Sequence, residues 1–216
     1  MRIVKACLVD VYDTILISRF PERQRVLASL AGVDPQAWDA HWLSLALDRD
    51  RGALTMAGAF ARVLSACGVD PAPDLVDRLV AADTELIVSH TDVYEDTVPT
   101  LTKLRAEGIR IALVSNCAPN TRPMLSAKGL LDLADAAVLS CEAGVAKPDP
   151  EIYLIALQAL GTPAADAVML DDQPRFCAGA AAVGVRPIQV VRPGIDHQPD
   201  PRFASVASLA DALALL

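Results

Sequence analysis

Short apolar stretches mark several strands along this chain. The first runs from Ile3 to Val9, is interrupted only by Lys5, and ends at Asp10. A run of this length, rich in β-branched residues and bounded by polar ones, predicts a buried strand. Similar runs predict four later strands, over Ile109–Ser115, Ala136–Ser140, Ala167–Leu170 and Pro187–Val191.

Between these runs, apolar residues recur at helical spacing. The pattern predicts helices over Val98–Ala106, Arg122–Lys128, Pro150–Leu160, Arg175–Val183 and Ser205–Leu215, with a loop through Gly144. Glycines placed to end a helix follow three of them, at Gly108, Gly129 and Gly161. Strands that alternate with helices of this length predict an α/β fold with a doubly wound parallel sheet.

The segment after the first strand has a different pattern. From Pro21 to about Ser89 it is helical throughout, with helices predicted near Arg23–Leu30, Ala37–Leu47, Thr55–Cys67 and Asp74–Val88. An all-helical insertion at this point would lie over the carboxyl edge of the sheet as a lid. We therefore expect residues 1–16 and 91–216 to form a Rossmann-like core, and residues 17–90 to form a helical cap.

Length and composition are those of a globular protein. The 216 residues are 53% hydrophobic, which is enough for a sizeable core. No apolar run approaches the roughly 20 residues that span a bilayer, and residues 1–5 do not resemble a signal peptide. Five scattered cysteines show no metal-ligand spacing. We expect a cytoplasmic protein with reduced thiols and no membrane partner.

The charge distribution bears on possible ligands. The net charge is −8, the four lysines are dispersed, and no basic block is present. Nucleic acid is therefore not an expected partner. A small anion can still be bound through a local group of donors or through a metal ion.

Polar residues recur where predicted strands end, the edge at which open α/β sheets bind ligands. They are Asp10 with Thr14, the pair Ser115-Asn116, Lys147 in the stretch Lys-Pro-Asp-Pro, and the pair Asp171-Asp172. Taken singly, each also fits an ordinary strand end, turn, helix cap or solvated loop. Taken together, they would place a carboxylate nucleophile, a hydroxyl, an amide, an ammonium group and an acidic pair suited to Mg²⁺ in one crevice.

This ordered set resembles the four motifs of the haloacid dehalogenase superfamily, and the resemblance covers nearly the whole chain, including the helical cap. It implies that Asp10 is a nucleophile that forms a covalent intermediate. It further implies that Ser115 binds the oxygens of the attacked group beside Asn116. Lys147 would pair with both the nucleophile and the bound anion.

The same resemblance implies a metal site. Asp10, Asp172 and the backbone carbonyl of Tyr12 would hold Mg²⁺, and Asp171 would support them. Thr14 would orient the loop that carries the nucleophile, and the side chain of Tyr12 would face the substrate together with Asn116. The implied partner is a small molecule, with a phosphorylated metabolite as the first expectation.

Several residues depart from the phosphatase pattern. Phosphatases of this superfamily place a second aspartate two residues after the nucleophile, to protonate the leaving alcohol. This chain has Tyr12 there, followed by Asp13. Tyr12 and Tyr153 instead resemble 2-haloacid dehalogenases, whose halide leaving group needs no proton and which work without metal. Those enzymes, however, carry Ser or Asn-type residues at the position of the acidic pair, and an aspartate at the position of Phe176.

Three hypotheses follow. The first is a Mg²⁺-dependent hydrolase of small phosphomonoesters, because a developing phosphoryl charge calls for a metal ion and a lysine. The second is a metal-independent 2-haloacid dehalogenase, and the third is a non-catalytic binding protein. The polar and aromatic cap residues would either contact a substrate carboxylate or sugar phosphate or lie on solvated faces and in the cap core. They are Arg19, Arg23, Arg25, Trp38, His41, Trp42, Arg49 and Arg51.

Overall fold

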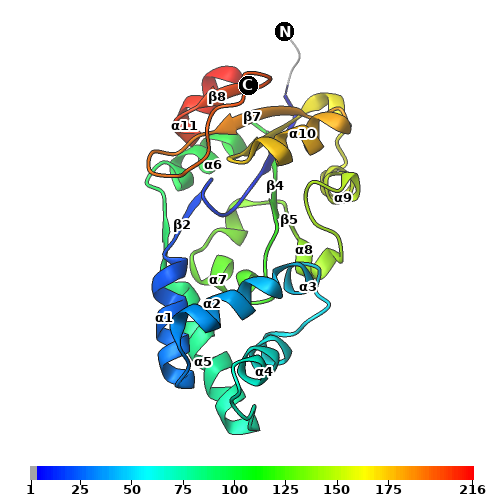
Figure 1. The fold of residues 1–216 in the computed structure, drawn as a ribbon. Helices are drawn as coiled ribbons and strands as arrows, with labels where there is room; N and C mark the ends of the chain where they lie inside the picture. Colours follow the sequence, from blue (N-terminus) through cyan, green and yellow to red (C-terminus); the bar gives the residue numbers. More distant parts are fainter. Residues whose placement is uncertain (1–3) are drawn as a thin grey trace.

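The computed structural model describes residues 4–216, and within that range a single parallel sheet forms the centre of the molecule (Figure 1). Its strand order is β5-β4-β1-β6-β7-β8. The strands are β1 Ala6–Val9, β4 Arg110–Ser115, β5 Ala136–Leu139, β6 Ala167–Asp171, β7 Arg186–Val190 and β8 Ala204–Val206. The chain adds strands on one side of β1 and then on the other, so the order reverses there. The predicted doubly wound α/β class is confirmed.

Helices cover both faces of this sheet. They are α6 Thr97–Ala106, α7 Thr121–Ala127, α8 Ser140–Ala143, α9 Pro150–Leu160, α10 Pro174–Ala182 and α11 Leu209–Ala212, with 3-10 turns at Leu131–Leu133, Ala164–Asp166 and Leu213–Leu215. Within β1, Cys7 and Val9 belong to one hydrophobic cluster, whereas Ala6 and Leu8 belong to another. The sheet is therefore buried on both faces, as parallel sheets are.

The helical insertion has a core of its own. It consists of α1 Phe20–Ala31, α2 Pro35–Ser44, α3 Ala46–Asp50, α4 Met56–Ala66 and α5 Pro73–Ser89, and a short antiparallel pair, β2 Leu16–Ser18 with β3 Thr91–Val93, flanks it. Trp38, Trp42 and Phe60 stack inside it, with the Trp42 and Phe60 ring centroids 5.1 Å apart. In Figure 1 the insertion, drawn in blue to teal, lies below the sheet.

Local sequence explains where several helices begin and end. The carboxylate of Asp34 accepts hydrogen bonds from two backbone amides at the start of α2, and Pro35 is the first helical residue. Asp149 and Pro150 begin α9 in the same way. Gly161 ends α9 with a φ of 58°, a conformation that favours glycine. The predicted helix Pro150–Leu160 is confirmed with the same bounds.

Some short elements differ from the predictions. The prediction of a helix over Ser205–Leu215 is wrong at its start. Ala204–Val206 is the edge strand β8, and α11 covers only Leu209–Ala212. The predicted helix Ala37–Leu47 is divided, because α2 ends at Ser44. The segment before Gly144, expected to be a loop, contains α8. Elements of three to five residues are too short for hydrophobic periodicity to identify.

Two further predictions concern the start of the first strand and the possibility of a membrane-spanning segment. The predicted first strand begins at Ile3, which lies outside the described residues. In the part of the chain that the structure describes, every helix is too short or too polar to cross a membrane.

Arg192 connects the loop after β1 to Asp96, which directly precedes α6. Its Nε and Nη2 donate to the Thr14 carbonyl at 3.0 and 2.8 Å, and its Nη1 and Nη2 donate to the Asp96 carboxylate at 2.9 Å each. Asp96 also accepts from the Leu209 amide at the start of α11, at 2.7 Å. Arg192 is buried. This one guanidinium therefore fixes the loop that carries Asp10 and Thr14.

Replacing Arg192 by Met is expected to destabilise the fold by about 3 kcal/mol, because the Asp96 carboxylate loses its ion-pair partner and the Thr14 carbonyl loses its guanidinium donors. The corresponding fall in Tm is on the order of 10 °C. Thermal unfolding by circular dichroism measures it. Arg202, which pairs with Asp200 on the surface, provides the matched control, and Arg202→Met should leave Tm nearly unchanged. Equal shifts in both variants would contradict the linking role of Arg192.

Candidate active site

The polar residues at the strand ends lie on three neighbouring strands. Ser115 ends β4, Asp10 directly follows β1, and Asp171 ends β6. The Asp10 amide donates to the Leu170 carbonyl at 2.9 Å, which continues the pairing of β1 with β6. Because the strand order reverses at β1, these carboxyl ends border the crevice in which α/β proteins of this topology bind ligands.

Lys147 lies between two of the carboxylates. Its Nζ is 2.5 Å from Asp10 Oδ1 and 2.6 Å from Asp171 Oδ2, and its side chain is fully buried. Burial alone would lower the pKa of Lys147, but the charges of Asp10 and Asp171 raise it well above its usual value. The Nζ also lies 4.7 Å from the centroid of the Phe176 ring. Lys147 is therefore a charged ammonium beside Asp10.

Two other predicted residues position this pair. The Asn116 side chain donates to the Lys147 carbonyl at 2.8 Å and accepts from the Lys147 amide at 2.7 Å. Thr14 Oγ1 donates to Asp10 Oδ2 at 3.0 Å. The buried Ser115 hydroxyl is 3.5 Å from the Asn116 carbonyl, which is too long for a strong hydrogen bond. The structure thus brings Asn116, Lys147, Thr14 and Asp10 into one connected group.

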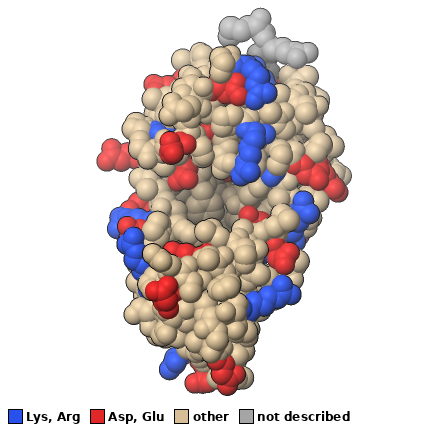
Figure 2. Space-filling view, in the orientation of Figure 1, with Lys and Arg blue, Asp and Glu red and all other residues tan. Residues whose placement is uncertain are grey.

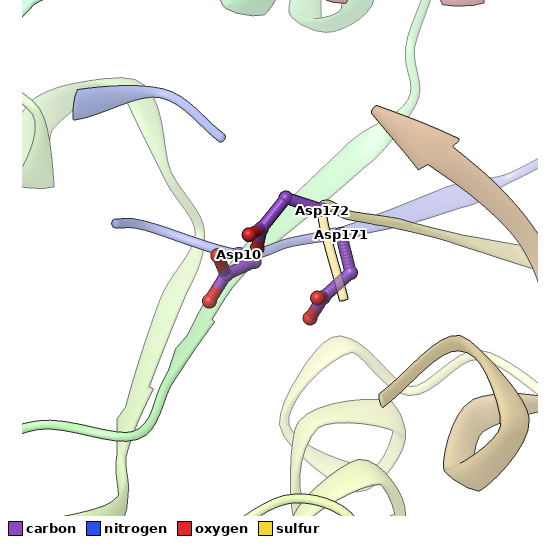
Figure 3. Close-up of side chains that lie close together, drawn as sticks. All are labelled: Asp10, Asp171 and Asp172. Carbon is purple, nitrogen blue, oxygen red and sulfur yellow. The ribbon is translucent and has the colours of Figure 1, made fainter. Parts of the chain in front are cut away.

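Asp10, Asp171 and Asp172 form an acidic cluster (Figure 3). One carboxylate oxygen from each lies within 4.8 Å of the others, and all three residues are buried. The oxygens of Asp171 are engaged, one by Lys147 and the other by the Gln173 amide at 2.9 Å. Neither oxygen of Asp172 accepts a hydrogen bond from the described residues. Asp172 therefore differs from Asp171, whose two oxygens both accept hydrogen bonds.

The charges in this cluster are unbalanced, because three carboxylates face one ammonium group. Burial and the charge of Asp10 raise the pKa values of both Asp171 and Asp172. Such a site suits a hard divalent cation, which takes oxygen ligands and would offset the excess negative charge. Asp10 and Asp172 fit the role of ligands, whereas Asp171 is held by Lys147 and the Gln173 amide.

Two groups near Asp172 were not predicted from the sequence. His197 Nδ1 lies 2.5 Å from Asp172 Oδ2, without the geometry of a hydrogen bond. Gln189, buried in β7, donates to the Asp172 carbonyl at 2.9 Å and to the Gln198 carbonyl at 3.0 Å. A glutamine inside an apolar strand is a recognisable signal. A lone histidine in the loop after that strand is not, because only the fold brings it near Asp172.

Tyr12 and Asp13, the departures from the phosphatase pattern, both border the site. The Tyr12 hydroxyl is 3.0 Å from Thr121 Oγ1, and burial raises the pKa of Tyr12. Asp13 has a φ of 59°, and burial together with the nearby charge of Asp10 raises its pKa. Tyr153, by contrast, is fully buried and donates to the Phe176 carbonyl at 2.8 Å. It packs behind the site.

Two adjoining cavities lie between the sheet and the insertion, where Figure 2 shows the surface hollowed. One, of about 200 Å³, contains Asp10 and is called here the reaction cavity. The other, of about 250 Å³, extends along the insertion and is called the cap-side cavity. Both are lined by Tyr12, Asp13, Asp50 and Asn116. The two residues predicted to face a substrate, Tyr12 and Asn116, therefore stand where the cavities meet.

The chain is similar in sequence to known hydrolases. A family profile described as haloacid dehalogenase-like hydrolase matches residues 4–184. A glyceraldehyde 3-phosphate phosphatase of Methanopyrus kandleri is 31% identical over 62% of this chain and 58% of its own length. An (S)-2-haloacid dehalogenase of Burkholderia cepacia is 28% identical over 66% of this chain and 59% of its own length. The matched part thus spans little more than half the length of these curated relatives.

Solved structures show the same architecture over a larger part of the chain. A 2-haloacid dehalogenase from Pseudomonas syringae pv. Tomato DC3000 superposes with a TM-score of 0.75, covering 99% of both chains at 23% identity. At this identity the likeness concerns the fold. The choice between the chemistries of such relatives depends on the residues around Asp10.

Proposed function

Because the chain belongs to the haloacid dehalogenase-like hydrolases, we propose that this hydrolase acts on small phosphomonoesters and requires Mg²⁺. One observation carries the proposal: both carboxylate oxygens of Asp172 are buried next to Asp10, and neither accepts a hydrogen bond from residues 4–216, although His197 Nδ1 lies close to one of them. A buried carboxylate of this kind is costly unless a cation or a proton neutralises it, and the adjacent Asp10 makes a shared cation the better solution. A phosphatase named among the curated relatives further supports the proposal.

In the proposed reaction Asp10 attacks phosphorus. Its Oδ2 is held by Thr14 and its Oδ1 by Lys147, so the carboxylate is oriented before substrate arrives. The new Asp10–phosphorus bond replaces the bond to the departing alcohol oxygen, and water then attacks phosphorus and releases phosphate and free Asp10. Lys147 stabilises the negative charge that develops on the phosphoryl oxygens. Mg²⁺ bound at Asp10 and Asp172 would add positive charge at the same point.

Tyr12 affects the choice of substrate for a test. The departing alcohol must gain a proton, and a tyrosine whose pKa is raised and whose hydroxyl is 3.0 Å from the Thr121 hydroxyl is a poor donor. Aryl phosphates release a weakly basic phenolate and need little protonation. A panel of test substrates should therefore include p-nitrophenyl phosphate beside alkyl phosphates.

We also propose that residues 17–90 act as a cap over the core formed by residues 1–16 and 91–216. Contacts between the two parts support the proposed position of the insertion against the core. The Asn120 side chain, in the core, donates to the Asp83 carboxylate in α5. Gly52, just after α3, lies so close to the Cys141 carbonyl that an added Cβ would stand 2.0 Å from its oxygen. The insertion thus encloses the cavities that border Asp10.

Phosphate release from that panel, measured with Mg²⁺ and with excess EDTA, tests the proposed function. We expect release with Mg²⁺, a loss of at least about 100-fold in EDTA, and recovery when Mg²⁺ is restored. An equal rate in EDTA would contradict the metal requirement.

The second candidate function is dehalogenation, which Tyr12 favours. Chloride release from 2-chloropropionate in EDTA, with no phosphate release under any condition, would replace our proposal by that reaction. If neither phosphate nor chloride is released, a protein that binds its ligand without turnover is favoured.

A further inference from the structure

Two arginines of the insertion are buried beside the cap-side cavity. Arg23 in α1 is 8% exposed and Arg49 in α3 is 6% exposed, and both line this cavity. Arginine is almost never so deeply buried unless it is paired. The neighbours Arg25 and Arg51, each two residues further along the chain, are exposed. Burial is therefore specific to the two guanidinium groups at the cavity.

Neither of these two buried side chains donates a hydrogen bond to another residue within the described range. The Nε atoms of both are enclosed without a partner. Among the described residues, no carboxylate lies within 4.0 Å of the Arg49 guanidinium, which is 3.8 Å from the centroid of a Trp42 ring. Burial lowers the pKa of Arg49 to about 10, so it stays charged at neutral pH. A buried cation with no acceptor is missing a partner.

Arg23 is only partly balanced by protein. Its Nε is 3.6 Å from Asp83 Oδ1, which is beyond hydrogen-bond distance, and the other oxygen of Asp83 accepts from Asn120. Two further carboxyl groups, Asp13 and Asp50, line the cavity, and burial raises the pKa of Asp50. None of these groups is hydrogen-bonded to either guanidinium. Both arginines line the cavity wall, and their guanidinium groups form no hydrogen bond with another described residue.

The position of this cavity connects the arginines to the reaction. Because Tyr12, Asp13, Asp50 and Asn116 line both cavities, a molecule with its phosphoryl group at Asp10 can extend directly into the cap-side cavity. An oxyanion is the partner that a guanidinium binds best, through paired N–H donors.

We propose that Arg23 and Arg49 bind a second anionic group, a carboxylate or a phosphate, at the end of the substrate remote from the phosphoryl group that Asp10 attacks. This inference rests on the proposed function and names a substrate class for it: short phosphomonoesters with an anion at each end. The two arginines act as specificity residues.

Matched esters test the inference. ω-Carboxyalkyl phosphates with two to four carbons are compared with their ω-carboxamide analogues, which have nearly the same shape without the charge, and with the corresponding alkanediol bisphosphates. We expect kcat/KM for the best substrate with an anion at each end to exceed that for the ω-carboxamide analogue by about 10- to 100-fold. The series with the higher kcat/KM, carboxyalkyl phosphates or alkanediol bisphosphates, identifies the anion that the two arginines prefer. A ratio near one for every pair would overturn the inference.

Substitutions of single arginines test whether Arg23 and Arg49 cause the preference for the charged ester. Arg23→Gln and Arg49→Gln should each reduce the ratio of charged to amide substrate toward one. Arg25→Gln and Arg51→Gln, which remove exposed arginines close by, should preserve the wild-type ratio. If Arg23→Gln unfolds because Asp83 loses its neighbouring cation, Arg23→Lys keeps that charge and should still lower the ratio through the lost fork of donors. Unchanged ratios in both buried-site variants would overturn the inference.

Binding to an Asp10→Asn protein separates this inference from the proposed function. Isothermal titration in Mg²⁺ should give a Kd for the charged ester about 10- to 100-fold below that for the amide. If the wild-type enzyme hydrolyses no ester, the proposed function fails, and the Kd ratio still decides whether the arginines bind the anion. If esters are hydrolysed without charge preference and bind equally, the proposed function stands and the arginine subsite is wrong.

Discussion

Asp10→Asn is expected to lower kcat for phosphomonoester hydrolysis by about 10⁴-fold or more, because an amide cannot replace the carboxylate nucleophile. The substitution keeps the shape of the side chain and its place beside Thr14. It also removes one of three carboxylates that face a single ammonium group, so the fold should be at least as stable. Phosphate release and thermal unfolding measure the two effects.

The matched control is Asp149→Asn. Asp149 is exposed and begins α9 by accepting a hydrogen bond from the Glu151 amide, a role that asparagine fills equally well. This variant should keep kcat and Tm close to wild type. An Asp10→Asn enzyme that retains a tenth of wild-type activity in the same assay would exclude Asp10 as the nucleophile.

Lys147→Met is expected to have the second-largest effect, with kcat lowered by about 10³-fold, because the developing phosphoryl charge loses its ammonium partner. Stability should also fall, by about 3–5 kcal/mol, since Asp10 and Asp171 are left as buried carboxylates without their shared cation. The paired loss distinguishes Lys147 from Asp10, whose replacement should affect activity alone. Kinetics and chemical denaturation of the same preparation give both values.

Lys103 offers a control for the loss of a lysine charge. It is exposed and lies 4.0 Å from Glu107 on the outside of α6. Lys103→Met should change neither kcat nor stability appreciably, because exposed ion pairs contribute little. A Lys147→Met protein as stable and active as this control would show that the ammonium group at the site is dispensable.

The sheet and the helical insertion were predictable from the sequence because their patterns extend over many residues. Five apolar runs separated by helical spacing predict the strands β1, β4, β5, β6 and β7, and long amphipathic stretches predict α1, α4 and α5. β2, β3 and β8 have three residues each, too few to show a strand pattern, so pairing with a neighbouring strand decides their conformation.

Much of the candidate site could be predicted for a different reason. Parallel strands all point their carboxyl ends to one edge, so residues that end or follow strands, such as Asp10, Ser115 and Asp171, are brought together by topology alone. Lys147 follows a loop and a short helix, and motif resemblance rather than geometry predicted its place. The catalytic roles of these residues and the boundaries of the cap stay predictions.

Contacts that depend on side-chain direction were beyond sequence reasoning. Arg23 and Arg25 belong to the same helix, and only the packing of α1 against its neighbours decides that the first faces the cavity and the second faces solvent. Arg192 reaches Thr14 across 178 positions of sequence. His197 approaches Asp172 from a loop whose path no local pattern predicts. Long-range contacts of this kind are set by the assembled fold.

Reductive trapping of Asp10 is the most direct test of the covalent mechanism. Acid quenching during turnover of a phosphomonoester with Mg²⁺, followed by borohydride reduction and peptide mass spectrometry, converts an aspartyl phosphate to homoserine. We predict homoserine at position 10, its absence when EDTA replaces Mg²⁺, and its absence in Asp10→Asn. Rapid phosphate release with no modified residue at position 10, or trapping there only with 2-chloropropionate and without metal, would contradict an aspartyl-phosphate mechanism at Asp10.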